Sequence, residues 1–319
     1  MPKLVFHTWQ QHILAAQAVI LNTGLSKRSI SLLSMPLNHI GGFAIAVRAE
    51  CSDGRWVLPH KAWVPTWALE QGVTHLSLVS TQLWRWMQDP IQVRALRKLK
   101  AILLGGSAIS RKLIKKAYEA ELPIITTYGS TETCSQVTAT KLGDSLEKLY
   151  TSGRCLVDRE IRVDASGEIL VRGAMIGYCH PGLDPGSSHN NCVALNIDWI
   201  PGQARDDKEW YATGDLGRID SDGYLHVLGR RDNRMISGGK NIYPEEIERA
   251  LLEHPDIERA LVVAKADPEF GQKPAAFVKL SHANELKPIE LQAFLRDRLE
   301  GFKVPKYWHS WPPKTPKLV

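Results

Sequence analysis

The sequence predicts an α/β protein: a mixed, mainly parallel sheet flanked by helices, followed by a small α+β domain. Three observations support this fold class. Strand-like apolar runs alternate with helix-like segments in the first half of the 319 residues. Glycines follow two of those strands, and the composition changes at Gly229 to Asn233. We therefore expect a large domain over residues 1–228 and a small domain over residues 229–319.

The first half of the chain supplies the alternating elements. Helices are predicted at His12 to Leu21, Ile40 to Ala49, Thr81 to Gln88 (with a threonine N-cap) and Ser110 to Glu119. Strands are predicted at Ser29 to Met35, Thr74 to Val79, Leu99 to Leu104 and Leu122 to Thr127. Ligands of such sheets bind at the carboxyl ends of strands, which is where Gly105-Gly106 and Tyr128-Gly129 stand.

The second half predicts a hairpin, a loop and the small domain. Asp158 to Val171 alternates as a hairpin does. Residues 179–207 are dense in Pro, Gly, Ser and Asn, so we expect an exposed inserted loop that folding does not need. The small domain is expected to contain a helix opened by Pro244, with acidic residues in its first turn. Its other predicted elements are strands at Arg259 to Lys265 and Pro274 to Leu280 and a helix at Leu291 to Leu299.

Composition excludes several classes of protein. Hydrophobic residues make up 44% and charged residues 23%, as in globular proteins. The net charge of +6 is spread along the chain without a dense Lys/Arg run, which does not predict nucleic-acid binding but suits small anionic ligands. The five cysteines are scattered, so they predict neither a disulfide framework nor a zinc site and indicate a reducing cytoplasm. No apolar run is long enough to predict a membrane span.

The segment from Tyr211 to Glu246 carries the densest set of candidate binding residues. Asp215 follows Thr213-Gly214, so a short carboxylate on a glycine turn is placed to accept two hydrogen bonds from a diol such as ribose. Arg230 offers a planar donor fork to the same sugar or to a phosphate. Further on, Ser237, Gly238 and Gly239 allow the main chain to approach a ligand closely.

This segment resembles the adenylate-forming superfamily of acyl-CoA ligases, peptide-synthetase adenylation domains and luciferases. Three other motifs resemble that superfamily and occur in its order: Pro36-Leu37-Asn38-His39, Leu104-Gly105-Gly106-Ser107 and Tyr128-Gly129-Ser130-Thr131-Glu132. Within the superfamily, Arg48 after an apolar helix and Ser135-Gln136 after the last motif look most like the o-succinylbenzoate–CoA ligases of menaquinone biosynthesis. A cationic Arg48 near an acyl pocket suits a substrate with a second carboxylate.

The resemblance implies a reaction in two steps. A carboxylate attacks the α-phosphate of ATP, and the thiolate of coenzyme A then displaces AMP to form a thioester; Mg²⁺ and cations offset the phosphate charge. By resemblance, Glu132 helps to hold the Mg²⁺ and Thr131 contacts phosphate. His39 and Ser135 join Arg48 at the acid site. The final catalytic lysine of the family is either Lys317 or a residue beyond Val319.

The resemblance also implies binding roles for the remaining motif residues. Tyr128 would stack on adenine, in a pocket also lined by Gly105, Gly106, Ser107 and Gly129. Asp215 and Arg230 would hold the ribose, and Asp232 would be the pivot about which the small domain turns between the two steps. Ser237, Gly238 and Gly239 would lie near the pantetheine tunnel. A homodimer is a further expected partner arrangement.

Each of these roles has an ordinary structural alternative. His39 can simply begin a helix, Glu132 can charge a helix N-terminus, and Asp215 can form an Asx-turn. Asp232 can be an ordinary acid in a linker.

The two ends of the chain look cut. Met1-Pro2-Lys3 resembles the last three positions of the family's phosphate loop, and Pro313-Lys314-Thr315 begins its last motif without the Gly-Lys pair that follows. We therefore expect an N-terminally truncated chain that adenylates weakly.

Two other functions stay open: a ligase for another aryl or acyl acid, and a catalytically dead remnant that binds only nucleotide or a partner.

Overall fold

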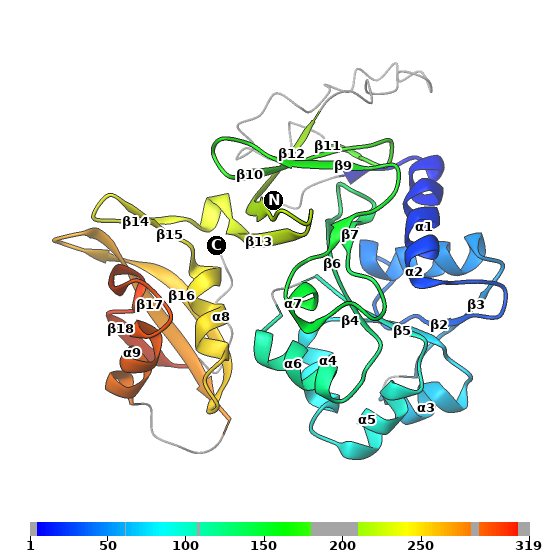
Figure 1. Cartoon of the computed structure of the whole chain (residues 1–319), viewed down its shortest axis with the longest axis horizontal. Helices are drawn as coiled ribbons and strands as arrows, with labels where there is room; N and C mark the ends of the chain where they lie inside the picture. Colours follow the sequence, from blue (N-terminus) through cyan, green and yellow to red (C-terminus); the bar gives the residue numbers. More distant parts are fainter. Residues whose placement is uncertain (1–4, 61, 107–108, 180–209, 282–286, 312–319) are drawn as a thin grey trace. The chain divides into compact units, whose positions relative to one another are not determined.

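The computed structural model describes residues 5–60, 62–106, 109–179, 210–281 and 287–311 (Figure 1). The chain divides into two compact units. The large unit consists of Met1–Ser107, Leu113–Thr213 and Arg218–His226, and the small unit of Ala108–Lys112, Gly214–Gly217 and Val227–Val319. The domain limits 1–228 and 229–319 stay a prediction. The expected inserted loop, from residue 180 onward, lies outside the described residues.

A seven-stranded sheet forms the centre of the large unit, in the order β3-β2-β4-β5-β6-β7-β8. Its strands are β2 (Ile30–Leu32), β3 (Arg55–Val57), β4 (His75–Leu78), β5 (Ala101–Leu104), β6 (Ile124–Ser130), β7 (Ser135–Ala139) and β8 (Arg154–Cys155). Pairing is parallel from β3 to β6 and antiparallel from β6 to β8. Every residue of β4 and β5 is buried, as expected of parallel strands covered on both faces. The predicted mixed, mainly parallel sheet is confirmed.

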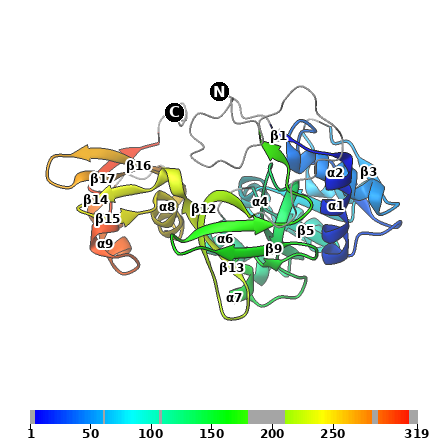
Figure 2. The same cartoon turned by 90° about the horizontal axis from the view of Figure 1, so that it is seen from above.

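Helices flank this sheet. They are α1 (Trp9–Thr23), α2 (Ile40–Cys51), α3 (Pro65–Glu70), α4 (Ser80–Trp86), α5 (Pro90–Arg97), α6 (Arg111–Glu119) and α7 (Leu146–Leu149). Helices α1 and α2 lie side by side (Figure 1, Figure 2), and Ala18 and Val19 of α1 pack against buried residues of β5 and β6. The Thr81 N-cap was wrong: α4 begins one residue earlier, and Gln82 Oε1 accepts a hydrogen bond from the main-chain N–H of Val79 at 3.1 Å.

A second sheet has the order β13-β12-β10-β9. Its strands are β9 (Glu160–Val163), β10 (Glu168–Arg172), β12 (Tyr211–Ile219) and β13 (Leu225–Arg230), and a short pair joins β1 (Val5–Phe6) to β11 (Tyr178–Cys179). Strands β9 and β10 form the hairpin predicted at Asp158 to Val171. Asp164 closes its turn, because Oδ1 accepts hydrogen bonds from the main-chain N–H groups of Ser166 and Glu168.

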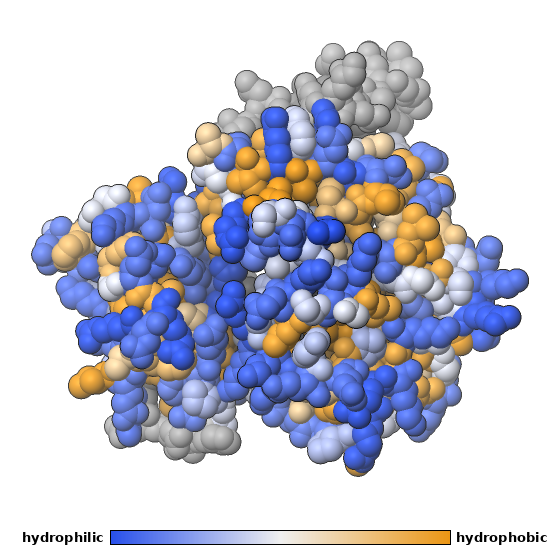
Figure 3. All heavy atoms as spheres, in the orientation of Figure 1, coloured by the Kyte–Doolittle hydropathy of each residue, from blue (hydrophilic) through white to orange (hydrophobic). Residues whose placement is uncertain are grey.

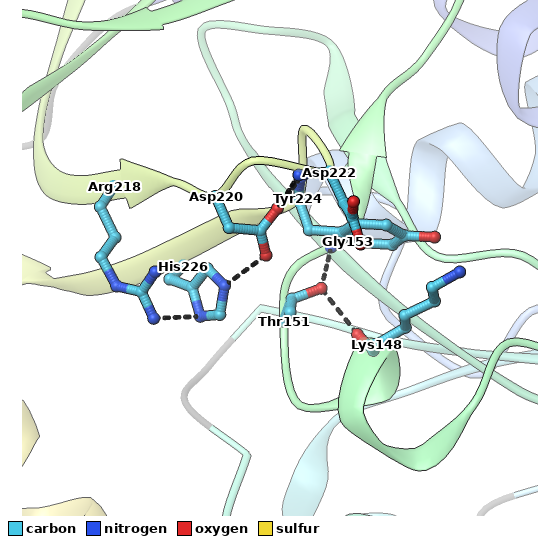
Figure 4. A network of polar contacts seen from close by, with 8 residues as sticks. All are labelled: Lys148, Thr151, Gly153, Arg218, Asp220, Asp222, Tyr224 and His226. Atoms are coloured by element: carbon cyan, nitrogen blue, oxygen red, sulfur yellow. Dashed lines mark hydrogen bonds and ion pairs between the residues drawn. The ribbon is translucent and has the colours of Figure 1, made fainter.

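The turn between β12 and β13 is held by a polar network (Figure 4). Asp220 Oδ1 accepts a hydrogen bond from the N–H of Tyr224 at 2.8 Å, and Oδ2 pairs with His226 Nε2 at 2.9 Å. Arg218 lies 3.3 Å from His226 Nδ1 and can only donate, so the proton of the neutral imidazole is on Nε2. Lys148 lies over the Tyr224 ring, which ties the turn to α7. These contacts fix the hairpin rather than form a reactive centre.

The small unit is an α+β domain, as predicted. A five-stranded sheet of β14 (Met235–Ser237), β15 (Lys240–Ile242), β16 (Ile257–Asp267), β17 (Gly271–Leu280) and β18 (Tyr307–Ser310) supports α8 (Pro244–Leu252) and α9 (Pro288–Arg296). Two 3₁₀ turns, η2 (Arg231–Asn233) and η3 (Gly301–Lys303), complete the described elements. The core joins Ile247 and Leu251 of α8, Leu295 of α9 and Ala276 of β17. Proline opens α8 and two acids follow it, as the sequence predicted.

A half-buried carboxyl on α8 predicts a pH-dependent stability. Glu248 accepts a hydrogen bond from the N–H of Val262 at 2.8 Å, and burial raises its pKa from 4.5 to about 7. Between those two values the folded chain binds more protons than the unfolded chain, so the free energy of unfolding should fall as pH rises from about 4.5 to 7. Glu248→Gln keeps the acceptor and should flatten this slope in urea titrations. Glu290→Gln, at an exposed ion pair, is the control; an unchanged slope in Glu248→Gln would contradict the account.

Polar and apolar side chains are mixed on the face seen in Figure 3, as on most protein surfaces. Among the described residues, no helix combines the length and apolarity that crossing a membrane requires.

Candidate functional site

Two glycines follow β5, where the sequence placed a ligand. A Cβ on Gly105 would lie 2.5 Å from Thr127 Oγ1, and Gly106 has a φ of +78°. At Gly105 the lack of space for a Cβ favours glycine, and at Gly106 the left-handed backbone conformation favours it. The main chain therefore passes unusually close to β6 at this point. Ser107, the third candidate in this motif, lies outside the described residues.

The motif from Tyr128 to Glu132 forms the end of β6 and the turn into β7. A Cβ on Gly129 would lie 1.7 Å from the main-chain oxygen of Ser135. Thr133 Oγ1 closes the turn: it accepts from the N–H of Ser130 at 2.9 Å and donates to the oxygen of Ser135 at 2.9 Å. Cys134 and Ser135 both have positive φ, 49° and 98°, which is strained for residues with side chains. The strain shows how tightly this turn is built.

Thr131 and Glu132 lie in the turn between β6 and β7. Thr131 is exposed and Glu132 is half-buried. The main-chain oxygen of Glu132 accepts a hydrogen bond from the N–H of Gly177 at 2.6 Å, which anchors the turn to the segment before β11. No helix begins at Glu132, because the turn leads directly into β7. The alternative in which Glu132 only charges a helix N-terminus is therefore wrong.

Arg48 is a buried cation on α2, only 4% exposed. Its guanidinium donates to Gln136 Oε1 at 2.7 Å and to Ser77 Oγ at 3.3 Å, and both partners are neutral. Ser135 Oγ donates to the same Gln136 oxygen at 2.7 Å. Burial lowers the pKa of Arg48 to about 10, so it stays charged at neutral pH. In the described part of the chain no carboxylate forms an ion pair with Arg48.

A small cavity lies beside this arginine. It is lined by residues from α1, α2 and the start of β7: His12, Ala15, Ala16, Ala44, Val47, Arg48, Cys134, Ser135 and Gln136. The structure thus brings two predicted residues, Arg48 and Ser135, to one cavity. Gln136 was noted in the sequence only as part of the Ser135-Gln136 pair, without a site role, and His12 was missed. A signal was present for His12, since it is a polar residue on a helix whose neighbours are largely apolar.

His39 is not among the residues that line the cavity. It is exposed and forms the N-cap of α2, where Nδ1 accepts a hydrogen bond from the N–H of Gly41 at 3.0 Å. The structure thus gives His39 the helix-starting role that the sequence left open. Its role at the acid site stays a prediction.

Two substitutions separate the two roles of His39. His39→Ala should lower the free energy of unfolding by about 1 kcal/mol, because the N-cap is lost. His39→Asn should keep most of the stabilisation that the N-cap provides. Urea titration measures this difference. If His39 also contacts the acid, both variants should bind an acyl-adenylate analogue more weakly than the parent. If both variants bind the analogue as the parent does, His39 acts only as the N-cap.

Asp215 and Arg230 form an ion pair in the small unit. Arg230 Nη1 lies 3.0 Å from Asp215 Oδ1, and the Asp215 side chain is 13% exposed against 51% for Arg230. Gly214 has a φ of +75°, and a Cβ there would approach Arg230 Nη2 to 3.3 Å. The motif lies inside β12 rather than on the expected turn, because one left-handed glycine bends a strand that continues past it. The two predicted ribose ligands are nevertheless brought together.

The remaining predicted residues lie in the small unit or outside the described residues. Asp232 is exposed within η2. Ser237 pairs with Lys240 across a two-residue hairpin turn, and Gly238 and Gly239 have φ of 54° and 77°. Such a turn requires two left-handed residues, so the hairpin alone explains both glycines. Lys317 lies outside the described residues.

Comparison with known proteins places these motifs in context. Residues 1–179 match the AMP-binding enzyme family, and residues 246–317 match the AMP-binding enzyme C-terminal domain. The 2-succinylbenzoate–CoA ligases of Bacillus velezensis and Escherichia coli are each 34% identical to this chain, over 95% and 98% of its length and 61% and 63% of theirs. The chain thus spans about three-fifths of the length of these curated relatives.

Solved structures agree with the sequence relatives. The o-succinylbenzoate CoA synthetase of Bacillus subtilis, in complex with the acyl-adenylate intermediate OSB-AMP, is 31% identical with a TM-score of 0.81, covering 97% of this chain and 62% of that one. The same enzyme has been solved with ATP and magnesium ion, at 30% identity and the same TM-score, covering 97% and 63%. With its first 179 residues matching the family and its fold shared with these structures, the chain belongs to the AMP-binding enzymes.

Proposed function

We propose that the protein is an AMP-forming acid–CoA ligase whose acid is o-succinylbenzoate. The observation that carries the proposal is Arg48: a buried cation beside a cavity, hydrogen-bonded only to neutral partners in the described residues. Burying an unpaired charge costs several kcal/mol, so a protein that keeps one gains from an anionic ligand. The names of the relatives support the same substrate.

The chemistry of the cavity lining matches an aromatic dicarboxylic acid, whose binding would require the cavity to widen beyond its present volume of about 10 Å³. Alanine and valine side chains form its apolar wall, and Arg48, Ser135 and Gln136 form its polar end. One carboxylate of o-succinylbenzoate would accept charge-assisted hydrogen bonds from Arg48 while the other reacts with ATP. A long-chain fatty acid has no group to pair with Arg48 and would leave that charge buried against methylene groups.

The turn after β6 is the proposed phosphate-facing element. Thr131 would donate its hydroxyl to phosphate, and Glu132 would supply one carboxylate to Mg²⁺. Mg²⁺ in nucleotide sites is usually held by one or two protein carboxylates together with phosphate oxygens and water, so the single carboxylate of Glu132 fits this ion. Bound there, Mg²⁺ would offset the negative charge that develops on the transferred phosphate.

The remaining candidate residues are proposed to contact the nucleotide, and each group is described within its own unit. On the large unit, Tyr128 would stack on adenine beside Gly105, Gly106 and Gly129. On the small unit, Asp215 would accept hydrogen bonds from the ribose and Arg230 would hold Asp215 in place. The Ser237–Gly239 hairpin near coenzyme A, the pivot role of Asp232, a homodimer and a cytoplasmic location stay part of this proposal.

The ribose contact can be tested by itself. Asp215→Ala should weaken AMP binding about ten-fold or more, because a hydrogen bond to a charged group contributes roughly 1.5–3 kcal/mol. Asp222→Ala, at an exposed residue of the β12–β13 turn, is the matched control and should bind AMP as the parent does. Calorimetry that gives equal affinities for all three proteins would remove Asp215 from the nucleotide site.

The substrate is tested by pyrophosphate release with ATP, Mg²⁺ and a panel of acids. We expect o-succinylbenzoate to give the highest rate, even where turnover is slow, with benzoate and palmitate far below it. A higher rate with another acid would favour the alternative ligase. No release with any acid, together with intact AMP binding, would favour a chain that only binds nucleotide.

A further inference from the structure

Three potential metal ligands lie together beside the cavity, two near the N-terminus and one more than a hundred residues further along the chain. His7 precedes α1, His12 lies on α1, and Cys134 lies in the turn between β6 and β7. One ligand atom from each lies within 4.8 Å of the other two. Within the described ranges, this is the one group of three or more His, Cys, Asp or Glu residues with such an arrangement. The spacing of the cysteines in the sequence predicted no zinc site. That prediction considered cysteines alone, whereas two of the three potential ligands here are histidines.

His7 has one ring nitrogen without a partner in the part of the chain that the structure describes. Its Nε2 atom is buried and has no hydrogen-bond partner among the described residues. The ring also hydrogen-bonds to the main chain of Thr131, a contact that therefore falls to Nδ1. Burial lowers the pKa of His7, so the ring is neutral at pH 7. Hydrogen bonding through Nδ1 fixes the tautomer and leaves the lone pair of Nε2 for a ligand, the arrangement found around protein-bound metals.

His12 and Cys134 offer the other two ligand atoms. Burial, and then the neighbouring His7, lower the pKa of His12 to about 4, so this ring is also neutral. Its edge-to-face contact with Phe43, at 4.9 Å between centroids, restricts its orientation. Cys134 is 1% exposed, and burial raises the pKa of its thiol to about 12, while the charge of Arg159 acts in the opposite direction. The thiol is thus protonated in the absence of a metal.

We propose that His7, His12 and Cys134 bind one Zn²⁺ ion at the wall of the cavity that contains Arg48. Two imidazoles and one thiolate are ligands that Zn²⁺ prefers and Mg²⁺ does not. Zinc bonds of about 2.0–2.3 Å place tetrahedral ligand atoms roughly 3.3–3.8 Å apart, which small side-chain rotations can reach from the present separations. On binding, the thiol proton is released to solvent as the zinc–sulfur bond forms.

The site leaves a fourth position for an exogenous ligand. His12 and Cys134 both line the cavity, so the open position faces the space beside Arg48. Three protein ligands with one open position are the pattern of zinc ions that also bind a small molecule or water. This site adjoins the turn that carries the proposed Mg²⁺ ligand Glu132, whose charge acts on His7. Its test nevertheless does not depend on ligase activity.

Metal binding by the purified, reduced 319-residue chain tests the proposal. Titration with Co²⁺ should give a thiolate-to-cobalt absorption band, and calorimetry with Zn²⁺ should give one ion per chain. Cys134→Ser should abolish the cobalt band, and both Cys134→Ser and His12→Gln should weaken Zn²⁺ binding by at least about ten- to a hundred-fold, the loss seen when even an outer ligand partner is removed. Circular dichroism checks that each variant is folded.

Cys155→Ser is the matched control, because Cys155 is a free, partly buried cysteine outside the cluster. It should bind both metals as the parent does. Absence of stoichiometric Zn²⁺ binding by the parent would overturn the proposal. So would unchanged binding in the folded Cys134→Ser and His12→Gln variants, which would assign the metal to other cysteines and histidines of the chain.

Discussion

Gly129→Ala is expected to destabilise the large unit by about 3 kcal/mol or more. The added Cβ would lie 1.7 Å from the main-chain oxygen of Ser135 and 2.8 Å from the Cα of Gln136. These are backbone atoms, so no side-chain rotation relieves the clash, and β6 must separate from β7. Gly129 is exposed, so the cost comes from the main-chain clash alone. Overpacking typically costs about 1–3 kcal/mol, and a clash that only a main-chain shift can relieve lies at the upper end. Urea titration of the purified chain measures the loss.

The control for this prediction is Gly301→Ala. No atom lies within 4 Å of a Cβ built on Gly301, and its φ is not left-handed. Its free energy of unfolding should stay within about 0.5 kcal/mol of the parent, as at most surface positions. An equally stable Gly129→Ala would show that the turn carrying Thr131 and Glu132 is not packed as described.

Arg48→Met is expected to weaken binding of an o-succinylbenzoyl-adenylate analogue about ten- to a hundred-fold. A hydrogen bond to a charged group contributes roughly 1.5–3 kcal/mol, and each 1.4 kcal/mol corresponds to a factor of ten. The variant should remain folded, because it removes a charge that is costly to bury and because Gln136 Oε1 keeps its hydrogen bond from Ser135 Oγ. Calorimetry with a non-hydrolysable acyl-sulfamoyl adenosine gives the affinity, and urea titration gives the stability.

Arg159→Met serves as the control for a buried arginine. Arg159 is 8% exposed and donates to the main-chain oxygens of Val157 and Ala15, but its side chain does not line the cavity. Its loss should lower stability, because those oxygens lose their charged donor, and should leave the affinity for the analogue largely unchanged. An equal loss of affinity in both variants would mean that the effect of Arg48 is structural.

The sequence predicted the elements whose hydrophobic period is long and regular. The buried runs of β4 and β5 and the helices α1, α2 and α6 fall within a few residues of the expected limits. Short elements were missed: β3 and β14 have three residues each, too few to show a period. For α8 the start was predicted correctly, because proline at a helix start is a local signal that does not depend on packing.

The residues of the candidate site also differ in whether the sequence could predict them. Arg48 and Ser135 were predicted from motifs, and the fold brings them to one cavity. Asp215 was expected on a turn, but the strand pairing of β12 overrode the local preference of Thr213-Gly214. The cluster of His7, His12 and Cys134 could not be predicted, since the sheet alone brings the β6–β7 turn against the start of α1.

We propose that this chain recognises its acid through a second carboxylate. Calorimetry can compare the affinity of the parent chain for two acyl-sulfamoyl adenosines: the o-succinylbenzoyl compound and the benzoyl compound, which lacks the second carboxylate. The o-succinylbenzoyl compound should bind more tightly by about ten-fold or more, a difference that Arg48→Met abolishes. Equal affinities, or a difference that survives in Arg48→Met, would contradict this proposal.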